Sequence, residues 1–325
     1  MARSLVTGGQ GFIGGHLCQA LLKRGDSVLV LDLPDAPGNA LEIHGIRAEV
    51  ELIEGDVADR GAVGRAVRGA DTVFHLAAQT LVGPAAEDPE GTFRSNVEGT
   101  WTVLEACREA GVGRVVVASS DKAYGPSDSL PYHEQDELRP AAPYEGSKAA
   151  ADIISRSYWP SWGLPVGVTR LANVYGGGDL NFSRLIPEVV TAYLAGRRPR
   201  IRSDGSPQRD FLHVSDAVAA YLAIEAALSS DKARGEALNA GTGRPRSVRE
   251  VIDRIQVATG SDQQPDYLLD RNPEGEIDRQ FVDPSRLCDL TGWQPQMSFG
   301  DGIEEAVDWY GSHGEIVPAR SDQVD

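Results

Sequence analysis

Tyr144 and Lys148 stand four residues apart in the sequence YEGSK, and in a helix this spacing places both side chains on one face. A phenol with a pKa of about 10 is a poor base at neutral pH unless a nearby cation stabilises its anion. The ammonium of Lys148 can supply that charge. Because the protein has only four lysines, a chance pairing at this spacing is less expected. The pair predicts a tyrosinate base, with a surface aromatic–cation pair as the alternative.

Three further reactive side chains, Ser120, Asp121 and Lys122, come shortly after the apolar run VVVA at residues 115–118. Such a run is typical of a buried strand, and active sites of doubly wound sheets lie beyond the carboxyl ends of strands. A hydroxyl, a carboxylate and an amine in succession can orient a substrate and transfer protons. The alternative is a surface Asp–Lys pair that closes the strand and contributes little to stability.

Glycines recur at Gly8, Gly11 and Gly14, between an apolar run and an amphipathic stretch. Glycine lets backbone N–H groups approach a pyrophosphate, and the N-terminus of the following helix adds partial positive charge. Asp32, at the end of the next apolar run, is placed to bond ribose hydroxyls and to repel a 2′-phosphate, which predicts NAD rather than NADP. Asp56 is placed to meet the adenine edge, to cap the helix that begins at Arg60, or to do both.

Short apolar runs alternate with amphipathic stretches through the first half of the chain. Continuous apolar strands separated by helices favour a parallel sheet that is covered on both faces, and right-handed crossovers make such a sheet doubly wound. The expected strands are Ser4–Thr7, Ser27–Leu31, Val50–Ile53, Thr72–Leu76, Arg114–Ser119 and Pro165–Arg170, and the expected helices are Phe12–Arg24, Arg60–Arg68 and Thr92–Ala110.

Glycine and proline become denser after residue 173, and the expected helices become shorter. We therefore predict an α/β Rossmann domain over residues 1–173, to which residues 211–241 return, and a smaller substrate-binding part from residues 174–210 and 242–325. Helices are expected in this second half at Ser215–Ala227, Val248–Ala258 and Gly302–Tyr310.

Composition limits the class of protein. The 325 residues are 41% hydrophobic, which fits a globular chain, and the net charge of −17 argues against binding to nucleic acid or to an anionic membrane. The three cysteines lie far apart, so neither a disulfide framework nor a metal site is predicted. The sequence shows no signal peptide and no apolar run long enough for a membrane helix. We expect a cytoplasmic enzyme with a small-molecule substrate.

Taken together, these motifs resemble the extended short-chain dehydrogenase/reductase family, in its nucleotide-sugar epimerase and dehydratase branch. The resemblance covers nearly the whole chain and implies the Rossmann fold, NAD and a nucleotide-diphosphate sugar. It also implies a homodimer formed through the helices Thr92–Ala110 and Ala149–Tyr158. Besides the glycine loop and the Tyr–Lys pair, it rests on HLAA at residues 75–78, Asn96, RLANVYG at 170–176, RDF at 209–211, GWQP at 292–295 and Trp309-Tyr310.

By position, the resemblance implies that Tyr144 is the base, that Lys148 is its partner and that Ser120 contacts the sugar 4-hydroxyl. The residues expected around NAD are Gly8, Gln10, Gly11, Phe12, Ile13, Gly14, Asp32, Asp56, Val57, Leu76, Ala77, Ala78, Asn96, Tyr144 and Lys148. The residues expected around the nucleotide sugar are Ser120, Tyr144, Asn173, Asn181, Leu185, Arg209 and Arg271.

The branch contains several reactions that share oxidation at the sugar C4. A 4-epimerase then only rotates the 4-keto sugar and returns the hydride to the opposite face of C4. A decarboxylase loses CO₂ from a uronate and uses the ketone as an electron sink. A 4,6-dehydratase must also remove the C5 proton and protonate the departing C6 hydroxyl, so it needs two more groups. Members that act on dTDP-glucose typically carry Asp then Glu at these positions, those that act on CDP-glucose resemble this chain with Asp then Lys, and epimerases usually carry small neutral residues.

Asp121 and Lys122 therefore favour a lyase: an NAD-dependent 4,6-dehydratase that converts an NDP-hexose to a 4-keto-6-deoxyhexose. A protonated Lys122 would hold Asp121 ionised, and an ionised carboxylate cannot act as an acid. The roles require a neutral Lys122 with a protonated Asp121, or a pair that exchanges one proton. A 4-epimerase, an NDP-glucuronate decarboxylase and a non-catalytic NAD sensor stay as alternatives, although such sensors usually lose Tyr or Lys.

Overall fold

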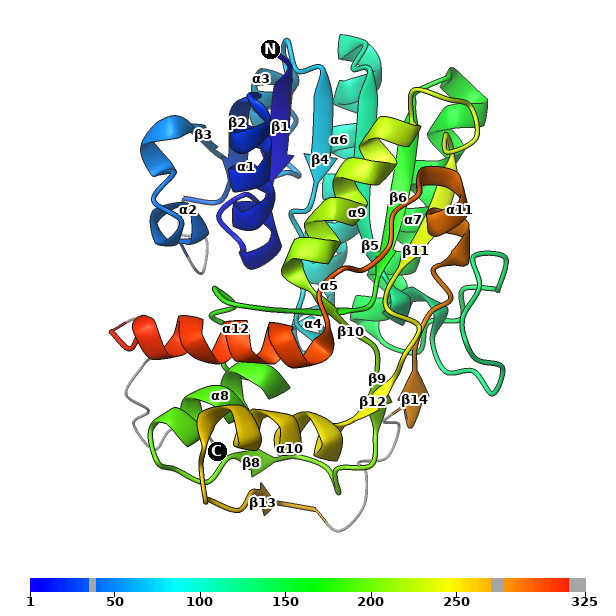
Figure 1. The fold of residues 1–325 in the computed structure, drawn as a ribbon. Coiled ribbons are helices and arrows are strands. Elements are labelled where there is room, and N and C mark those ends of the chain that lie inside the picture. Colours follow the sequence, from blue (N-terminus) through cyan, green and yellow to red (C-terminus); the bar gives the residue numbers. More distant parts are fainter. Residues whose placement is uncertain (35–38, 270–276, 316–325) are drawn as a thin grey trace.

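The computed structural model describes residues 1–34, 39–269 and 277–315. Its centre is a seven-stranded sheet in which every neighbouring pair of strands is parallel, in the order β3-β2-β1-β4-β5-β6-β11 (Figure 1). This order reverses between β1 and β4, which confirms the predicted doubly wound α/β fold. The strands are β1 (Arg3–Thr7), β2 (Ser27–Asp32), β3 (Glu51–Glu54), β4 (Thr72–His75), β5 (Arg114–Ser120), β6 (Val166–Leu171) and β11 (Glu236–Ala240).

Helices cover both faces of the sheet because alternate strand residues point to opposite sides. Val6 packs with α1 and α9 on one face, whereas its neighbour Leu5 packs with α3, α6 and α7 on the other. The two hydrophobic cores therefore share the same strands. The covering helices are α1 (Phe12–Arg24), α9 (Val214–Ala227) and α11 (Ser285–Thr291) on the first face, and α3 (Arg60–Val67), α6 (Gly99–Ala110) and α7 (Pro143–Trp162) on the second.

The second half of the chain builds a smaller layer below the carboxyl ends of the strands in Figure 1. A third core joins its helices, and the short parallel pair β7 (Asn173–Tyr175) and β10 (Phe211–His213) leads into it. The layer contains α8 (Leu185–Leu194), α10 (Val248–Thr259), α12 (Phe299–Ser312), β8 (Arg200–Ile201), β9 (Gln208–Arg209), β12 (Arg246–Ser247), β13 (Asp266–Tyr267) and β14 (Arg279–Gln280).

The predicted strands and helices agree with the structure to within a few residues, with one exception. The helix expected over Thr92–Ala110 is wrong in its first part, where α5 (Pro89–Phe93) is followed by a π-helical turn at Arg94–Glu98 before α6 begins. Asn96 lies in this turn and bonds outside its own helix. π-Turns are frequent at functional sites, and the apolar spacing of the sequence does not reveal them.

Four further short helices belong to the described part of the chain. They are α2 (Ala40–Ile43), α4 (Val82–Glu87) and the 3₁₀ turns Arg47–Glu49 and Asp121–Tyr124. No helix in the described part of the chain combines the length and the apolar character needed to cross a membrane.

Candidate active site

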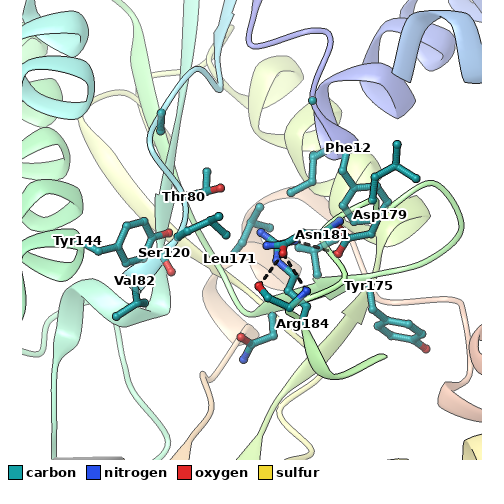
Figure 2. A pocket seen from close by; sticks show the side chains of 18 of the residues that line it. Phe12, Thr80, Val82, Ser120, Tyr144, Leu171, Tyr175, Asp179, Asn181 and Arg184 are labelled. Atoms are coloured by element: carbon teal, nitrogen blue, oxygen red, sulfur yellow. Dashed lines mark hydrogen bonds and ion pairs between the residues drawn. The ribbon is translucent and has the colours of Figure 1, made fainter. Parts of the chain in front are cut away.

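A cavity of about 1360 Å³ opens at the carboxyl ends of the parallel strands, between the large sheet and the smaller layer. This volume exceeds that of a typical small-molecule site and can hold a cofactor and a substrate together. Of the residues expected around NAD, all but Asn96 line it, and so do all those expected around the nucleotide sugar except Arg271, which lies outside the described residues. Figure 2 shows Tyr144 beside Ser120 on one side of the cavity and Arg184 across from them.

The glycine loop after β1 is packed so tightly that only glycine fits. Gly8 has a φ of 74°, and a Cβ added there would lie 2.7 Å from the backbone nitrogen of Ala77. A Cβ on Gly14 would overlap the carbonyl oxygen of Gly8. Gly11 caps α1 without a side-chain hydrogen bond, so the N–H groups of the first turn stay available to a bound anion. The loop therefore fits a dinucleotide pyrophosphate.

Asp32 ends β2 beside this loop and lines the cavity. Its carboxylate accepts hydrogen bonds from the backbone nitrogens of Gln10 at 2.8 Å and Leu33 at 2.9 Å. Burial raises the pKa of Asp32, and the two hydrogen bonds oppose that effect. The carboxylate is thus held at the edge of the loop, where it can accept from a ribose and exclude a 2′-phosphate.

Asp56 follows β3 and also lines the cavity. The alternative that it caps α3 is wrong, because the side chain of Asp59 accepts from the backbone nitrogen of Gly61 at 2.7 Å and occupies that position. Asp56 instead accepts from the backbone nitrogen of Ala58 at 2.8 Å and pairs with Arg94 at 3.2 Å. Its place in the cavity leaves the contact with adenine as the surviving prediction.

Tyr144 and Lys148 lie in the first turns of α7, and both side chains are buried at the cavity. Burial raises the pKa of Tyr144 to about 12, although the hydroxyl of Ser120 and the charge of Arg184 act in the opposite direction. Burial lowers the pKa of Lys148 to about 8. The Nζ of Lys148 donates to the carbonyl oxygen of Ala118 on β5 at 3.0 Å. Strand β5 therefore fixes the side chain of Lys148. The raised pKa of Tyr144 keeps its phenol protonated at neutral pH as long as no cofactor or substrate is bound.

Asn96 is buried but does not line the cavity. Its Oδ1 accepts from the backbone nitrogen of Gln79 at 2.7 Å, and its Nδ2 donates to the carbonyl oxygen of Gln79 at 2.9 Å. The same Nδ2 donates to Ser147 Oγ on α7 at 2.8 Å. Asn96 thus fastens the loop after β4, which carries Ala77 and Ala78, to the helix that carries Tyr144. Its position supports an indirect effect on the cofactor site.

Ser120 is the last residue of β5, Asp121 and Lys122 begin the 3₁₀ turn that follows, and all three line the cavity. Ser120 Oγ donates to Asp121 Oδ1 at 3.2 Å, whereas Asp121 Oδ2 is buried without a hydrogen-bond partner. Burial raises the pKa of Asp121 and outweighs the opposing charge of Lys122. The ammonium of Lys122 donates to Gln280 Oε1 at 3.3 Å, and none of the ion pairs among the described residues joins it to Asp121. The objection that Lys122 must keep Asp121 ionised is therefore weakened.

Several residues of the smaller layer that line the cavity were not predicted from sequence as site residues, among them Arg184, Arg202 and Phe211. The guanidinium of Arg184 pairs with the buried carboxylate of Asp179 at 3.0 Å and lies near enough to Tyr144 to influence its pKa (Figure 2). Arg202 and Phe211 lie further along the same wall. Opposite charges at residues 179 and 184 in a glycine-rich segment were the available signal for the ion pair.

The family model described as the NAD dependent epimerase/dehydratase family matches residues 4–241. The chain belongs to this family. It is 34% identical over 315 residues to a dTDP-glucose 4,6-dehydratase of Mycolicibacterium smegmatis, covering 95% of this chain and 93% of the relative.

Two solved structures show how family members with different reactions share this architecture. The dTDP-glucose 4,6-dehydratase DesIV of Streptomyces venezuelae, with NAD and TYD bound, superimposes with a TM-score of 0.88 at 32% identity, covering 96% of this chain and 98% of that one. The UDP-glucose 4-epimerase of Thermotoga maritima, with UDP-glucose, reaches the same TM-score of 0.88 at 27% identity, covering 95% and 99%. Membership of the NAD dependent epimerase/dehydratase family confirms NAD as the expected cofactor.

Proposed function

We propose that this protein is an NAD-dependent 4,6-dehydratase of a nucleotide-diphosphate hexose. The observation that carries the proposal is the carboxyl of Asp121, which is buried at the cavity with one oxygen unpaired and with its pKa raised by burial. Burial favours the protonated form of this carboxyl, and a protonated carboxyl can give a proton to a leaving hydroxyl. An epimerase has no use for such an acid.

The first step oxidises the sugar at C4, with one hydrogen leaving O4 as a proton and the other leaving C4 as a hydride. Tyr144 takes the proton of O4, Ser120 holds that oxygen, and the ammonium of Lys148 stabilises the phenolate. The glycine loop, Asp32 and Lys148 would hold NAD, which would supply the acceptor for the C4 hydride and the hydride that C6 receives. The supporting geometry is the burial of Tyr144, Ser120 and Lys148 along one wall of the cavity.

The second step eliminates water across C5 and C6 of the 4-keto sugar. The amine of Lys122 takes the C5 proton, and the electron pair of the C5–H bond forms the double bond to C6. The C6–O bond breaks, and the proton of Asp121 leaves with the hydroxyl as water. Hydride then adds to C6, and the proton returns from Lys122 to C5. Because Ser120 bonds both Tyr144 and Asp121, it offers a path for the proton that resets the pair.

The substrate class follows from the charges of the smaller layer. Arg184 and Arg209 line the cavity, and a guanidinium suits a diphosphate because it can donate two parallel hydrogen bonds. The relatives named above include an enzyme of dTDP-glucose, whereas Asp121 followed by Lys122 resembles members that act on CDP-glucose. The nucleobase therefore stays open between these two, and Asn173, Asn181 and Leu185 are proposed to complete the site.

One experiment separates the dehydratase from its alternatives. The purified protein is incubated with NAD and with CDP-, dTDP-, UDP- or GDP-glucose, and the products are analysed by mass spectrometry. Loss of one water from one of these sugars is expected. A product of unchanged mass with an inverted C4 would establish the 4-epimerase instead, release of CO₂ from an NDP-glucuronate would establish the decarboxylase, and NAD binding without any turnover would favour a sensor.

We also propose a homodimer in the cytoplasm. The helices α6 and α7 lie side by side on the outer face of the sheet, and their exposed surface carries large apolar side chains that a water-facing helix seldom has. Trp101 on α6 is 40% exposed, and Ile153 and Trp162 on α7 are 58% and 57% exposed. Replacing Ile153 by Asp should produce monomers in sedimentation velocity, and unchanged sedimentation would contradict the proposal.

A further inference from the structure

Gln280 is a polar side chain in an unusual place, because it is fully buried although it lies in the short strand β14 near the edge of the smaller layer. A buried amide without hydrogen-bond partners costs free energy, so its partners show what it is there for. Both of its partners belong to the segment after β5: Lys122 and the backbone of Asp121. The residue therefore reaches from the C-terminal layer into the catalytic segment.

The two ends of the Gln280 amide serve two different partners. Its Oε1 accepts from the ammonium of Lys122 at 3.3 Å, and its Nε2 donates to the carbonyl oxygen of Asp121 at 3.3 Å. The opposite orientation of the amide would place two donors against each other and two acceptors against each other. The partners thus allow a single orientation, and the amide acts as a clamp across consecutive residues.

This clamp holds the nitrogen of Lys122 at one place on the wall of the cavity, which Lys122 lines. The hydrogen bond to Gln280 occupies one position around that nitrogen, and the other positions are available to a ligand in the cavity. The same hydrogen bond directs the Lys122 nitrogen to Gln280, whereas the carboxyl of Asp121 accepts from Ser120. The acid and the base therefore have separate hydrogen-bond partners.

The backbone of Gln280 is held as firmly as its side chain. β14 pairs in parallel with β9, and in this register Gln280 lies opposite Arg209. The carbonyl oxygen of Gln280 accepts from the backbone nitrogen of Asp210 at 3.1 Å. The carboxylate of Asp210 is buried and accepts from the backbone nitrogens of Thr242 and Gly243. Gln280 therefore belongs to the same pair of strands, β9 and β14, as Arg209 of the proposed diphosphate site.

We infer that Gln280 is a positioning residue for the elimination of water: it orients the Lys122 amine toward C5 of the substrate and keeps this amine separate from Asp121. The inference rests on the proposed dehydratase function. It concerns the second step alone, because Gln280 has no contact with Tyr144, Ser120 or Lys148 among the hydrogen bonds of the described residues.

The experiment compares the parental protein with Gln280→Met, which keeps the length of the side chain and loses both hydrogen bonds. Oxidation at C4 is followed in a single turnover by the absorbance of reduced nicotinamide, C5 deprotonation by deuterium uptake from the solvent, and water loss by mass spectrometry. Deuterium uptake and water loss should fall about 100-fold, as expected for a misplaced catalytic group, while C4 oxidation and nucleotide affinity stay within about threefold.

Gln280→Glu is the second variant, and it covers the case in which Gln280→Met does not fold. It keeps an acceptor for Lys122 but adds a charge that holds the ammonium, so C5 deprotonation should again fall while C4 oxidation persists. Gln256→Met is the matched control, since Gln256 lies in α10 and bonds the carbonyl oxygen of Gln263 at 2.9 Å, away from the cavity. This control should behave as the parental protein.

The outcomes distinguish a failure of the proposed dehydratase function from a failure of the proposed role of Gln280. If the parental protein removes water from none of the four NDP-glucoses, the proposed function fails and the role of Gln280 falls with it. If the parental protein removes water and both Gln280 variants do so at the parental rate, the role of Gln280 alone is overturned. An equal loss of C4 oxidation and of water loss would also overturn it, because that pattern indicates general damage to the site.

Discussion

Arg170 and Asp152 form a buried, two-pronged ion pair that joins strand β6 to α7, the helix that carries Tyr144. The Nε of Arg170 lies 2.8 Å from Asp152 Oδ2, and its Nη2 lies 3.0 Å from Asp152 Oδ1. Both side chains are at most 1% exposed. Asp152 is one helical turn beyond Lys148 on α7, so the pair fixes the rotation and height of the helix that carries Tyr144 and Lys148. Arg170 also donates to the Tyr124 hydroxyl at 2.8 Å.

Removing one partner of this pair should destabilise the protein strongly. Asp152→Ala leaves the guanidinium of Arg170 buried without its counter-ion, and we expect the free energy of unfolding to fall by about 3–5 kcal/mol. Urea denaturation followed by circular dichroism measures the change. The double variant with Asp152→Leu and Arg170→Met should recover most of the loss, since it leaves no buried charge unpaired; Arg156, which also pairs with Asp152, is partly exposed to water. A single variant as stable as the parental protein would show that the pair is not structural.

Tyr144→Phe should abolish the oxidation at C4 without unfolding the protein. Loss of the proton acceptor is expected to reduce the rate by about 10²–10⁴-fold, measured as reduced nicotinamide formed in a single turnover. The matched control is Tyr193→Phe, since the Tyr193 hydroxyl is buried on α8 without a hydrogen-bond partner. This variant should keep the parental rate and should not lower the melting temperature. Comparable rates for Tyr144→Phe and the parental protein would remove Tyr144 as the base.

Much of the fold could be predicted because it depends on local patterns. The apolar runs that became β1, β2, β4, β5 and β6 are buried on both faces, and such strands stand out from the amphipathic helices between them. The π-turn at Arg94–Glu98 could not be predicted in this way. It depends on the bonds of Asn96 to Gln79 and Ser147, which lie 17 and 51 residues away in the chain.

The site also contains residues that local sequence predicts and residues that it does not. A turn or a helix sets the spacing of the first kind, so the sequence within a few residues was enough to predict Gly8, Gly14, Tyr144 and Lys148. Gln280 gave no signal, since its partner Lys122 is 158 residues away and the contact exists only once the smaller layer has folded against β5. Glu134 gave no signal for the same reason: its carboxylate is buried and accepts from the backbone nitrogen of Asn239 at 2.9 Å, 105 residues further along the chain.

Gly14→Ala should prevent NAD binding, because the added methyl group would overlap the carbonyl oxygen of Gly8 and push the phosphate-binding loop away from α1. We expect loss of NAD binding in isothermal titration calorimetry and a lower melting temperature. Gly64→Ala is the matched control, since a Cβ on this exposed glycine of α3 meets nothing within 4 Å. The control should raise the stability by about 0.5–1 kcal/mol, as alanine does in a helix, and leave NAD affinity unchanged. Parental NAD affinity in Gly14→Ala would rule out the loop as the phosphate site.

Asp121→Asn should abolish the loss of water while leaving the oxidation at C4 measurable. The amide cannot supply the proton that the departing C6 hydroxyl needs, whereas Tyr144 and Lys148 are untouched. The expected product is a 4-keto sugar of the parental carbon skeleton with its 6-hydroxyl retained, detected by mass spectrometry after borodeuteride reduction. If Asp121→Asn removes water at the parental rate, then Asp121 is not the acid.

The same variant should change how stability depends on pH. Burial raises the pKa of Asp121 above its ordinary value of 3.8. A carboxyl with a raised folded-state pKa favours the folded protein below the unfolded-state pKa, and this contribution is lost as pH rises through the folded-state pKa. Asn does not titrate, so Asp121→Asn should be the more stable protein at pH 8, by about 1–3 kcal/mol as for a buried group without partners, and this advantage should shrink toward pH 4.

Thermal unfolding across this pH range measures the difference between the two proteins, and Asp262→Asn serves as the control because Asp262 is exposed. The control should run parallel to the parental protein at every pH. An Asp121→Asn variant that is less stable than the parental protein at pH 8 would mean that the ionised carboxylate is stabilised in the folded state. The residue would then be a poor acid, because a carboxylate held ionised by Lys122 and Ser120 has no proton to give to the leaving hydroxyl.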